Sequence, residues 1–557
     1  MNAEIDASTR ALLTQAEAWL AEDPDPETRA ELADVIGAVR ATDAAATADL
    51  ADRFAGMLQF GTAGLRGALG AGPNRMNRVV VGRAAAGLAA YLNEQVGPGG
   101  SVVIGFDARK NSDVFARDTA EIMTGAGIKA FLMPSPLPTP LLAFSIRELG
   151  CAAGVMVTAS HNPPQDNGYK VYLGDGSQIV APADAQIAAH IAAVGPLPEV
   201  PRGSGGTVLD HSIVDTYLDT VADLATDGPR DLRIVYTPMH GVGGSSVLEV
   251  LEMAGFAEPL VVPEQAQPDP LFPTVAFPNP EEPGAMDLAL ALAAEHDADL
   301  VVANDPDADR CAAAIPTADG WRMLRGDEVG WLLASHLLDR GVQGTYACSI
   351  VSSQLLAKLA AAHGQPSAET LTGFKWISRV PGLAFGYEEA LGYCVDPQRV
   401  RDKDGVSALL LLSELAAATK ADGRTLSDLL DDLARTYGVH QTDQVSVRVT
   451  DLSLIADAMA RLRTAPPASL GGLPVVDYVD LAEGTPELPP TDGLRFLMRG
   501  EGGSSRVIVR PSGTEPKLKC YLEVSVPVTG EDLQAAKATA AAMTKALAAD
   551  VSAALGF

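Results

Sequence analysis

The feature that most constrains the fold is a short apolar run followed by a turn and a helical stretch, which recurs along the chain. Several of these runs are predicted to be buried strands: residues 101–107, 152–157, 233–237 and 344–351. Helical stretches follow the last two of them, at residues 246–254 and 354–363. Alternation of strand and helix predicts parallel sheets covered by helices, so we expect doubly wound α/β domains.

The pattern changes towards the C-terminus. Residues 444–449 and 505–510 alternate between apolar and polar side chains, and residues 519–524 form a further predicted strand. Such alternation is typical of an antiparallel sheet with one solvated face. A helix over residues 531–548 would cover the other face, which predicts a C-terminal α+β domain. At the other end of the chain, residues 8–57 are predicted to be helical, with a break at residues 23–26.

The charge balance excludes some classes of partner. The chain has 41 Lys and Arg against 71 Asp and Glu, a formal net charge of −30. This charge disfavours nucleic acid and anionic membranes, and an anionic substrate would need local basic groups. No window approaches the roughly 18 apolar residues of a membrane span, and the acidic N-terminus lacks a signal-peptide pattern. The five cysteines are scattered without metal-type spacing, so we expect a reducing, cytoplasmic location.

Ser160 lies in a turn between a predicted strand and a pair of prolines. The apolar run 152–157 leads into Thr-Ala-Ser-His-Asn-Pro, and Pro163 and Pro164 prevent the strand from continuing. The hydroxyl is therefore presented at the end of a strand, facing a cleft, where it can act as a nucleophile or carry a phosphate. A serine in such a turn can equally cap the backbone, so this interpretation needs support from other stretches.

Alternating aspartates directly follow the apolar run 301–304: Asp305, Asp307 and Asp309. Three carboxylates at every second position can converge on a hard cation, and oxygen ligands suit Mg²⁺. The pattern does not fit a calcium-binding EF-hand, because Arg310 stands at the sixth position, which needs glycine, and Pro316 at the twelfth, which needs glutamate. The sequence therefore predicts a cation site rather than a solvated acidic turn.

Two further stretches combine glycine with charged or aromatic residues. In residues 60–67, three glycines surround Arg66, which indicates a loop that approaches a ligand closely. In residues 386–393, Glu388 and Glu389 stand among glycines and two tyrosines, a combination suited to sugar hydroxyls and a sugar ring. The second stretch is equally compatible with the start of a helix that has acids in its first turn.

A compact group of anion-binding residues lies at 510–517, between two predicted strands. Its members are Arg510, Ser512, Gly513, Thr514 and Lys517. Their positive charges, hydroxyls and exposed backbone N–H groups can together cradle a phosphate. An ordinary polar hairpin loop is the alternative, but a local excess of positive charge is informative in so acidic a chain.

The glycine-rich stretch 241–246 offers a competing interpretation. It follows a predicted strand, opens a helix and has Glu264 about twenty residues further on, as in a dinucleotide-binding turn. However, Ser246 occupies the third glycine position, and residues 238–240 lengthen the turn. A dinucleotide site is therefore the minor alternative, since glycine patterns often occur without a nucleotide.

Taken together, the serine, aspartate, glutamate and phosphate stretches occur in the order found in the α-D-phosphohexomutase superfamily, which essentially the whole chain resembles. Residues 60–67, 75–77, 372–377 and 385–393 look more like the branch that contains phosphoglucomutase-2, phosphopentomutase and many bacterial phosphosugar mutases. The resemblance implies three α/β domains and a C-terminal α+β domain with an antiparallel sheet, around a central cleft.

Seams near residues 196–206, 313–320 and 437–444 mark the expected domain boundaries. The first two are rich in proline or glycine. Combined with the resemblance, the seams predict four domains: 1–205 with the serine loop, 206–318 with the metal loop, 319–440 with the sugar loop and 441–557 with the phosphate loop.

The resemblance also implies how the catalytic residues divide their roles. Ser160 would carry phosphate, and Mg²⁺ would be held by that phosphate together with Asp305, Asp307 and Asp309. The other catalytic residues implied are Arg66, His161, Lys170 and Arg310. The two arginines would flank the transferring phosphoryl group, and the lysine matches one that the family has ten residues after the serine.

The substrate-binding residues implied by the resemblance are Lys375, Glu388, Glu389, Arg510, Ser512, Gly513, Thr514 and Lys517. Glu388 would bind sugar hydroxyls, and the phosphate loop would clamp the phosphate that is not being transferred. Ala390 and Phe374 depart from patterns common among hexomutases, where Ser or His stands. These departures leave the sugar preference open.

The implied reaction interconverts a sugar 1-phosphate and 6-phosphate, with glucose as the expected sugar. The phosphate would pass from Ser160 to the sugar monophosphate, and glucose 1,6-bisphosphate would be the intermediate and activator. Phosphomannomutase, phosphopentomutase and a phosphotransferase that makes glucose 1,6-bisphosphate are the alternatives. The expected partners are small sugar phosphates, not nucleic acid or a membrane, and the expected state is a monomer or homodimer.

Overall fold

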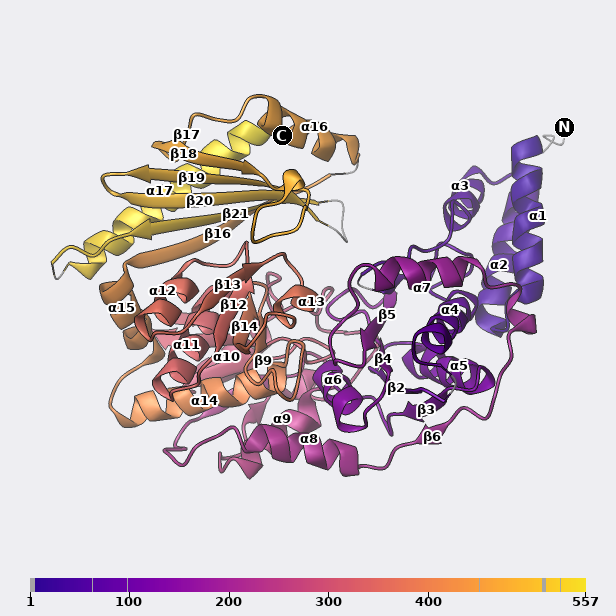
Figure 1. Cartoon of the computed structure of the whole chain (residues 1–557), viewed down its shortest axis with the longest axis horizontal. Coiled ribbons are helices and arrows are strands. Elements are labelled where there is room, and N and C mark those ends of the chain that lie inside the picture. Colours follow the sequence, from indigo (N-terminus) through magenta and orange to yellow (C-terminus); the bar gives the residue numbers. More distant parts are fainter. Residues whose placement is uncertain are drawn as a thin grey trace. The chain divides into compact units, whose positions relative to one another are not determined.

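The computed structural model describes residues 6–62, 64–97, 99–449, 451–512, 517–530 and 532–556. The chain forms two compact units, Met1–Met323 with Gly392–Glu414, and Leu324–Leu391 with Leu415–Phe557. The described residues form three α/β sheets and a C-terminal antiparallel sheet (Figure 1). The expected fold class is therefore confirmed.

The first unit begins with helices α1 (Ala7–Glu22), α2 (Pro26–Arg40) and α3 (Ala44–Arg53). The break expected at residues 23–26 is confirmed. An aspartate precedes each helix, and its carboxylate accepts hydrogen bonds from N–H groups of the first turn, which have no partner within the helix. Trp19, Leu32 and Ile36 bury these helices in the same core as the first sheet.

The first sheet has the strand order β1-β5-β4-β2-β3-β6. Its strands are β1 (Leu65–Ala68), β2 (Ser101–Phe106), β3 (Lys129–Leu132), β4 (Ala153–Val157), β5 (Asp166–Leu173) and β6 (Thr207–Val208). Its helices are α4 (Arg78–Val96), α5 (Ser112–Gly125), α6 (Thr139–Glu148) and α7 (Ala183–Ala192). Strands β2 and β4 run parallel, with Phe106 beside Val157, so the loops that follow them leave the same edge of the sheet.

The second sheet has the order β11-β10-β9-β7-β8. Its elements are α8 (Ser212–Ala222), β7 (Ile234–Thr237), α9 (Gly244–Met253), β8 (Leu260–Val261), α10 (Asp287–Glu295), β9 (Leu300–Ala303), β10 (Ala312–Thr317) and β11 (Gly320–Met323). Residues 313–320, where the sequence predicts a seam, form most of the β10–β11 hairpin, and the first segment of this unit ends shortly after them, at Met323. The first unit is completed by β15 (Gly392–Cys394) and the first part of α14 (Gly405–Ala421). Short 3₁₀ helices lie in connecting segments: η1 (Leu197–Glu199), η2 (Pro263–Gln265) and η3 (Leu481–Glu483).

The second unit contains a parallel sheet in which β12 (Thr345–Ser349) lies between β13 (Ser367–Thr370) and β14 (Leu383–Glu388). Its helices are α11 (Gly326–Asp339), α12 (Leu355–Ala362), α13 (Phe374–Ile377), the rest of α14, and α15 (Leu426–Tyr437). Strand β14 ends at Glu388, so residues 386–388 form a strand end. The alternative of a helix start at this stretch is therefore wrong.

The C-terminal sheet has the order β16-β21-β20-β19-β18-β17. Its elements are β16 (Val439–Arg448), α16 (Ser453–Thr464), β17 (Ser469–Leu470), β18 (Leu473–Asp480), β19 (Leu494–Gly500), β20 (Gly503–Pro511), β21 (Lys517–Val526) and α17 (Leu533–Leu555). Helix α17 crosses one face of the sheet, as expected (Figure 1). The predicted domain limit at residue 440 falls inside β16, and the four domain limits stay a prediction.

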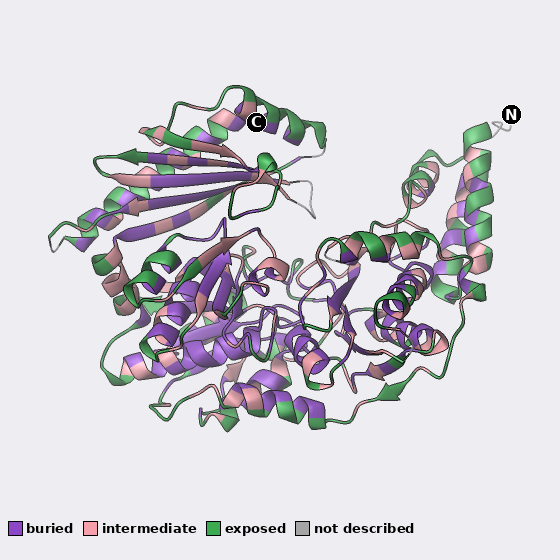
Figure 2. Ribbon diagram, viewed as in Figure 1, coloured by how far each residue is buried: buried purple, intermediate pink, exposed green. Residues whose placement is uncertain are grey.

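The other face of this sheet is not simply solvated, which corrects the sequence-based expectation. Ile508 and Tyr521 point away from the α17 core and pack with Ile350 and Val351, which follow β12. Much of β20 and β21 is buried, as Figure 2 shows in purple. The alternation predicted the two faces correctly, but it does not reveal what packs against the second one.

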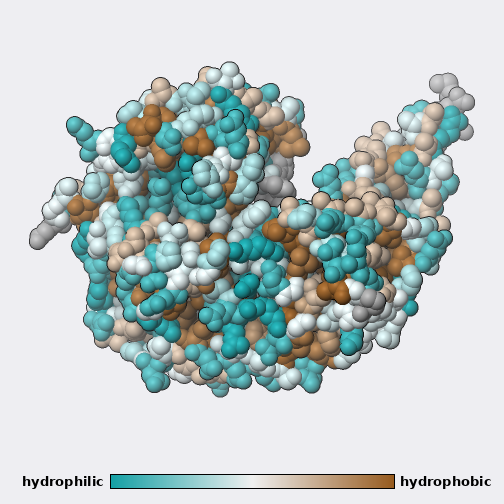
Figure 3. All heavy atoms as spheres, viewed as in Figure 1, coloured by the Kyte–Doolittle hydropathy of each residue, from teal (hydrophilic) through white to brown (hydrophobic). Residues whose placement is uncertain are grey.

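The surface agrees with the acidic composition. Hydrophilic residues, drawn in teal, are widespread on the face shown in Figure 3, and the hydrophobic residues form small separate groups. Among the residues that the structure describes, no helix combines the length and the apolar character needed to span a membrane.

Burial of the second sheet face predicts a measurable contribution to stability. Ile508 is 1% exposed, so Ile508→Ala should lower the free energy of unfolding by about 2–5 kcal/mol, through lost burial and the cavity left behind. Val476→Ala is the control, because Val476 is 58% exposed and should change this free energy by less than about 0.5 kcal/mol. Urea denaturation of both variants is the measurement. Equal, small effects would mean that the face is solvated.

Candidate functional site

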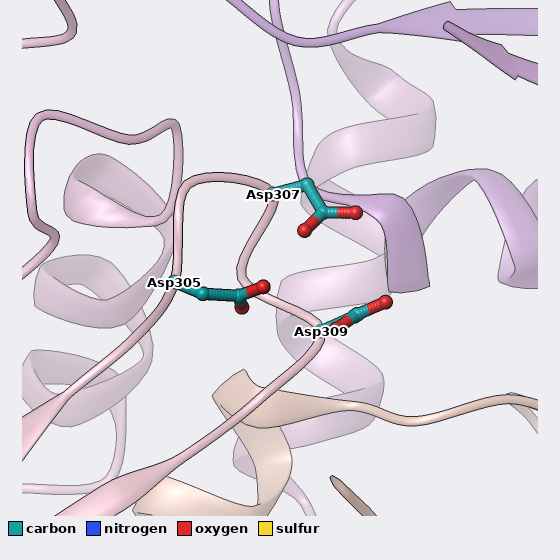
Figure 4. A group of neighbouring side chains, drawn as sticks. All are labelled: Asp305, Asp307 and Asp309. Atoms are coloured by element: carbon teal, nitrogen blue, oxygen red, sulfur yellow. The ribbon is translucent and has the colours of Figure 1, made fainter. Parts of the chain in front are cut away.

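The loop after β9 brings three carboxylates together. Asp305, Asp307 and Asp309 are buried, and one oxygen of each lies within 4.8 Å of the others. Figure 4 shows the three side chains directed from one loop towards a common space. The loop turns through Ala308, whose φ of 53° lies in the left-handed region, and Ala308 N–H donates to Asp305 O at 2.9 Å. The alternate spacing found in the sequence therefore produces a converging cluster.

Basic and hydroxyl groups from separate elements balance the charge of this cluster. Lys170, on β5, places Nζ 2.8 Å from Asp307 Oδ2 and 3.0 Å from Asp309 Oδ2. Lys403 Nζ lies 3.0 Å from Asp309 Oδ2. Thr139, at the start of α6, donates its hydroxyl to Asp307 Oδ2 at 2.6 Å. Buried charges are tolerated when they are paired in this way.

The pairing shifts the pKa values of the three carboxyls in different directions. Burial alone would raise every pKa here, but Lys170 holds the pKa of Asp307 and of Asp309 below the ordinary value, with help from Lys403 at Asp309. At Asp305, burial and the two neighbouring carboxylates dominate and raise the pKa well above its ordinary value. A bound cation would shift Asp305 back towards its ionised form.

Two carboxylate oxygens in the cluster are left without hydrogen bonds. Among the described residues, neither Asp307 Oδ1 nor Asp309 Oδ1 has a hydrogen-bond partner, although both atoms are buried. An unsatisfied buried carboxylate oxygen is costly, and a divalent cation would satisfy both atoms. The donor set is made entirely of oxygen, so the cluster can hold a hard cation.

The serine turn meets this cluster directly. Ser160 follows β4 with a φ of 52° and is 3% exposed. Its hydroxyl donates to Asp305 Oδ2 at 2.9 Å and lies 3.1 Å from His161 Nδ1. Thr158 Oγ1 accepts from the N–H of Ser160 at 2.9 Å, an ST-turn that fixes the backbone. The capping interpretation thus applies to Thr158, and the hydroxyl of Ser160 faces the carboxylates.

The remaining predicted catalytic residues, Arg310, Arg66 and His161, lie around the serine turn and the aspartate cluster. Arg310 Nε lies 3.8 Å from Asp309 Oδ1 and 4.0 Å from Asp305 Oδ2. Arg66 Nη1 donates to the amide oxygen of Asn162, two residues after Ser160, at 3.3 Å. Burial and the charges of Arg310 and Arg66 lower the pKa of His161 well below its ordinary value, so its ring is neutral at neutral pH.

Lys403 is a residue at this site that the sequence analysis missed. Its neighbours anchor it on both sides: Asp402 accepts from Tyr172 OH at 2.7 Å, and Asp404 from Tyr217 OH at 2.9 Å. Gly405 follows, and a Cβ there would lie 2.2 Å from the carbonyl oxygen of Arg310. The Asp-Lys-Asp-Gly run before α14 was the available signal, but nothing in the sequence links it to a loop about a hundred residues earlier.

The glycine-rich turn after β7 packs against the aspartate loop. A Cβ on Gly241 would lie 2.4 Å from Pro306 Cα, and one on Gly243 would lie 2.8 Å from Ala308 Cβ. Val242 N–H donates to Pro306 O at 2.8 Å. These glycines therefore permit close packing of two loops, which accounts for the pattern that resembles a dinucleotide-binding turn.

The predicted sugar-binding residues lie on the second unit. Glu388 Oε1 accepts from Gly373 N–H at 2.6 Å. Gly373 directly precedes α13, which contains Lys375. Glu389 Oε2 accepts from the hydroxyls of Ser349 and Ser352, at 3.1 and 3.2 Å. Ser349 ends β12 and Ser352 follows it. The sequence analysis did not single these serines out, because their partner lies about forty residues away.

The predicted phosphate loop lies on the same unit, at the facing ends of β20 and β21. Ser512 N–H donates to Lys517 O at 2.8 Å, which closes the hairpin. Burial and the nearby Glu389 raise the pKa of Tyr521, and Arg510 opposes that rise. Gly513 and Thr514 lie outside the described residues. The two sets of predicted site residues thus lie on different units.

Comparison with known families matches the chain to four consecutive domains. They are described as phosphoglucomutase/phosphomannomutase alpha/beta/alpha domain I over residues 57–196, domain II over 215–319, domain III over 325–437, and the C-terminal domain over 445–540. The matched segments together span most of the chain. All of the predicted site residues fall within them.

Individual proteins show the same relationship. A probable phosphomannomutase of Haemophilus influenzae is 51% identical over 456 residues, 80% of this chain and 93% of that protein. A phosphoglucomutase of Staphylococcus haemolyticus is 35% identical and covers 84% and 90% of the two chains. The crystal structure of Paramecium pp63/parafusin, 20% identical, covers 90% and 96% of the two chains with a TM-score of 0.69, which shows a likeness of fold.

Packing of the glycine turn against the aspartate loop can be tested by adding a single methyl group. Gly241→Ala should displace Pro306 and weaken Mn²⁺ binding roughly 10- to 100-fold, because the loop could no longer hold its carboxylates in place. Gly244→Ala is the matched control, since its Cβ would meet nothing closer than Ala266 O at 3.5 Å. Calorimetric titration with Mn²⁺ is the measurement. Equal affinities in the two variants would contradict the packing argument.

Proposed function

Because the chain belongs to the phosphoglucomutase/phosphomannomutase family and is thus a phosphosugar mutase, we propose that it interconverts glucose 1-phosphate and glucose 6-phosphate through a phosphate on Ser160. The observation that carries the proposal is the 2.9 Å hydrogen bond from the Ser160 hydroxyl to a buried carboxylate of the aspartate cluster. Such a hydroxyl stands among charged groups suited to a transferring phosphoryl group.

Charge balance supports the assignment of Ser160. A phosphate there would bring about −1.5 to −2 charges next to three carboxylates. Lys170 and Lys403 already contact the carboxylates, and Arg66 and Arg310 border the serine turn and the cluster. These four basic side chains would offset the added charge, so that an anionic sugar phosphate is not repelled.

The aspartate cluster fits Mg²⁺. Asp305, Asp307 and Asp309 would hold the ion together with the phosphate on Ser160. The observation that favours the ion is that one buried oxygen of Asp307 and one of Asp309 lack a hydrogen bond among the described residues. When bound, the ion would neutralise charge that develops on the transferring phosphoryl group. His161 Nδ1 lies 3.1 Å from the serine oxygen, within hydrogen-bonding distance of it.

The residues of the second unit would bind the rest of the substrate. We assign Lys375, Glu388 and Glu389 to the sugar, and the loop formed by Arg510, Ser512, Gly513, Thr514 and Lys517 to the phosphate that is not transferred. The bond between phosphorus and the Ser160 oxygen breaks as a bond forms to the free hydroxyl oxygen of the sugar monophosphate, and the proton of that hydroxyl ends on the Ser160 oxygen. Glucose 1,6-bisphosphate then turns round and returns its other phosphate to Ser160, so it serves as both intermediate and activator.

The phosphate carrier can be tested by one substitution. Ser160→Ala should abolish mutase turnover, with a loss of at least about 10³-fold, because the variant lacks the hydroxyl that carries the phosphate. Intact-mass analysis after incubation with glucose 1,6-bisphosphate should show one phosphate on the wild type and none on the variant. Thr158→Ser keeps the ST-turn and serves as the control. A phosphate retained by Ser160→Ala would contradict the assignment.

Mannose is the second candidate sugar, because the 51% identical relative is named as a probable phosphomannomutase. The test is a panel of glucose, mannose and ribose 1-phosphates, each assayed with its own bisphosphate as activator. Our proposal expects the highest kcat/KM for glucose 1-phosphate. A higher kcat/KM for mannose or ribose would overturn the sugar assignment and leave the mutase reaction in place. Accumulation of bisphosphate from an acyl phosphate donor would instead indicate a bisphosphate synthase.

A further inference from the structure

Arg109 is a buried cation that is not among the residues assigned above. It lies just after β2, and its residue is 3% exposed. Strands β2 and β4 end side by side, so the loop that carries Arg109 and the turn that carries Ser160 leave the same edge of the sheet. The guanidinium is therefore placed beneath the serine turn.

The guanidinium binds four carbonyl oxygens of that turn. Nη2 donates to Ser160 O at 2.5 Å and to Asn162 O at 2.6 Å. Nη1 donates to Pro163 O at 2.8 Å and to Asp166 O at 3.2 Å. One side chain thus ties together the carbonyls on both sides of the bend, including that of Ser160 itself.

The turn needs such a partner for two reasons. Ser160 has a φ of 52°, a left-handed backbone conformation that is unfavourable for a residue other than glycine. The prolines at 163 and 164 interrupt regular backbone pairing, so carbonyls that point inward must find another donor. A guanidinium offers five N–H donors in a planar fork, whereas a lysine ammonium offers three on a flexible stem.

Arg109 is itself held in place. Asp107 Oδ2 lies 3.4 Å from its Nε, and Asp107 Oδ1 accepts from Ser112 Oγ at 2.6 Å. The ring of Phe272, from the segment between η2 and α10, lies 4.9 Å from the guanidinium carbon. An aromatic face against a desolvated cation is a favourable contact. Asp107 therefore holds the guanidinium at Nε and the Phe272 ring lies against its plane, while Nη1 and Nη2 donate to the carbonyls of the turn.

We propose that Arg109 is the positioning residue of the serine turn, which holds the Ser160 oxygen in the geometry required for phosphoryl transfer. This inference rests on the proposed function of Ser160. Arg109 acts through the backbone, so its loss should slow transfer while leaving the substrate-binding residues of the second unit intact. Displacement of a reacting atom by about 1 Å can cost about 100-fold in rate.

The main variant is Arg109→Lys, which keeps the charge and removes the fork. The matched control is Arg230→Lys. Arg230 also donates to backbone carbonyls, of Ala254 at 2.7 Å and Pro229 at 2.9 Å, and lies 4.9 Å from the ring of Phe256, but it does not contact the serine turn. Phe272→Leu is a milder variant that removes the aromatic ring and keeps the Arg109 guanidinium. It keeps the inference testable if Arg109→Lys fails to fold.

For Arg109→Lys we expect kcat to fall about 100-fold and KM to change less than about 3-fold, and for Phe272→Leu a smaller fall in kcat. Arg109→Ala should recover part of its kcat when millimolar guanidinium is added. Arg230→Lys should retain wild-type kcat. Hydrogen exchange of residues 158–166, measured by mass spectrometry, should accelerate in Arg109→Lys but not in Arg230→Lys.

Two kinds of failure are distinguishable. Unchanged kcat and unchanged exchange in Arg109→Lys would overturn the role of Arg109, while the wild-type mutase assay and the phosphate on Ser160 would still support the proposed function. If the wild type has no mutase activity but exchange accelerates selectively in Arg109→Lys, the proposed function fails, and Arg109 still holds the turn. Equal effects of Arg109→Lys and Arg230→Lys on all readouts would reduce Arg109 to a general structural role and overturn the inference.

Discussion

The interaction on which the first unit depends is the pairing of the buried carboxylates of Asp307 and Asp309 with lysines from other parts of the chain. Asp307 and Asp309 would be very costly to bury alone, and Lys170 and Lys403 make their burial possible. Because these lysines belong to β5 and to the segment before α14, burial of the loop after β9 depends on both the first sheet and residues 392–414. The oxygens that remain without hydrogen bonds are then available to a cation.

The serine turn and the aspartate loop are both supported by residues that do not take part in the chemistry. Ser160 and Ala308 both have positive φ values, so neither turn is a relaxed backbone. The aspartate loop is supported by close packing, because side chains at Gly241, Gly243 or Gly405 would collide with it. The serine turn is supported by hydrogen bonds from Arg109. Strain at functional turns is expected to persist only where the surroundings determine the conformation in this way.

The second unit uses a similar arrangement at the C-terminal sheet. Glu523 on β21 accepts from Ser353 Oγ at 2.6 Å and is paired with Arg506 at 3.0 Å. Burial alone would raise its pKa, but Arg506 and His440 lower the pKa of Glu523 to about 2. This buried network and the apolar contacts of Ile508 explain why the second face of the sheet is covered. It also places the loop after β12, with Ser352, against the carboxylate of Glu389.

Local patterns in the sequence predicted several of the strands and helices, the fold class and the serine and aspartate loops, because apolar periodicity, turn residues and alternate carboxylates act over a few neighbouring residues. They could not reveal Lys403, Thr139 or Arg109, since each meets its partner across a long stretch of chain. The glycines near residue 241 were ambiguous for the same reason. A glycine that permits close packing and one that binds a phosphate look alike until the neighbouring loop is known. Only the tertiary structure decides which distant charges and carbonyls meet, because burial makes their pairing obligatory.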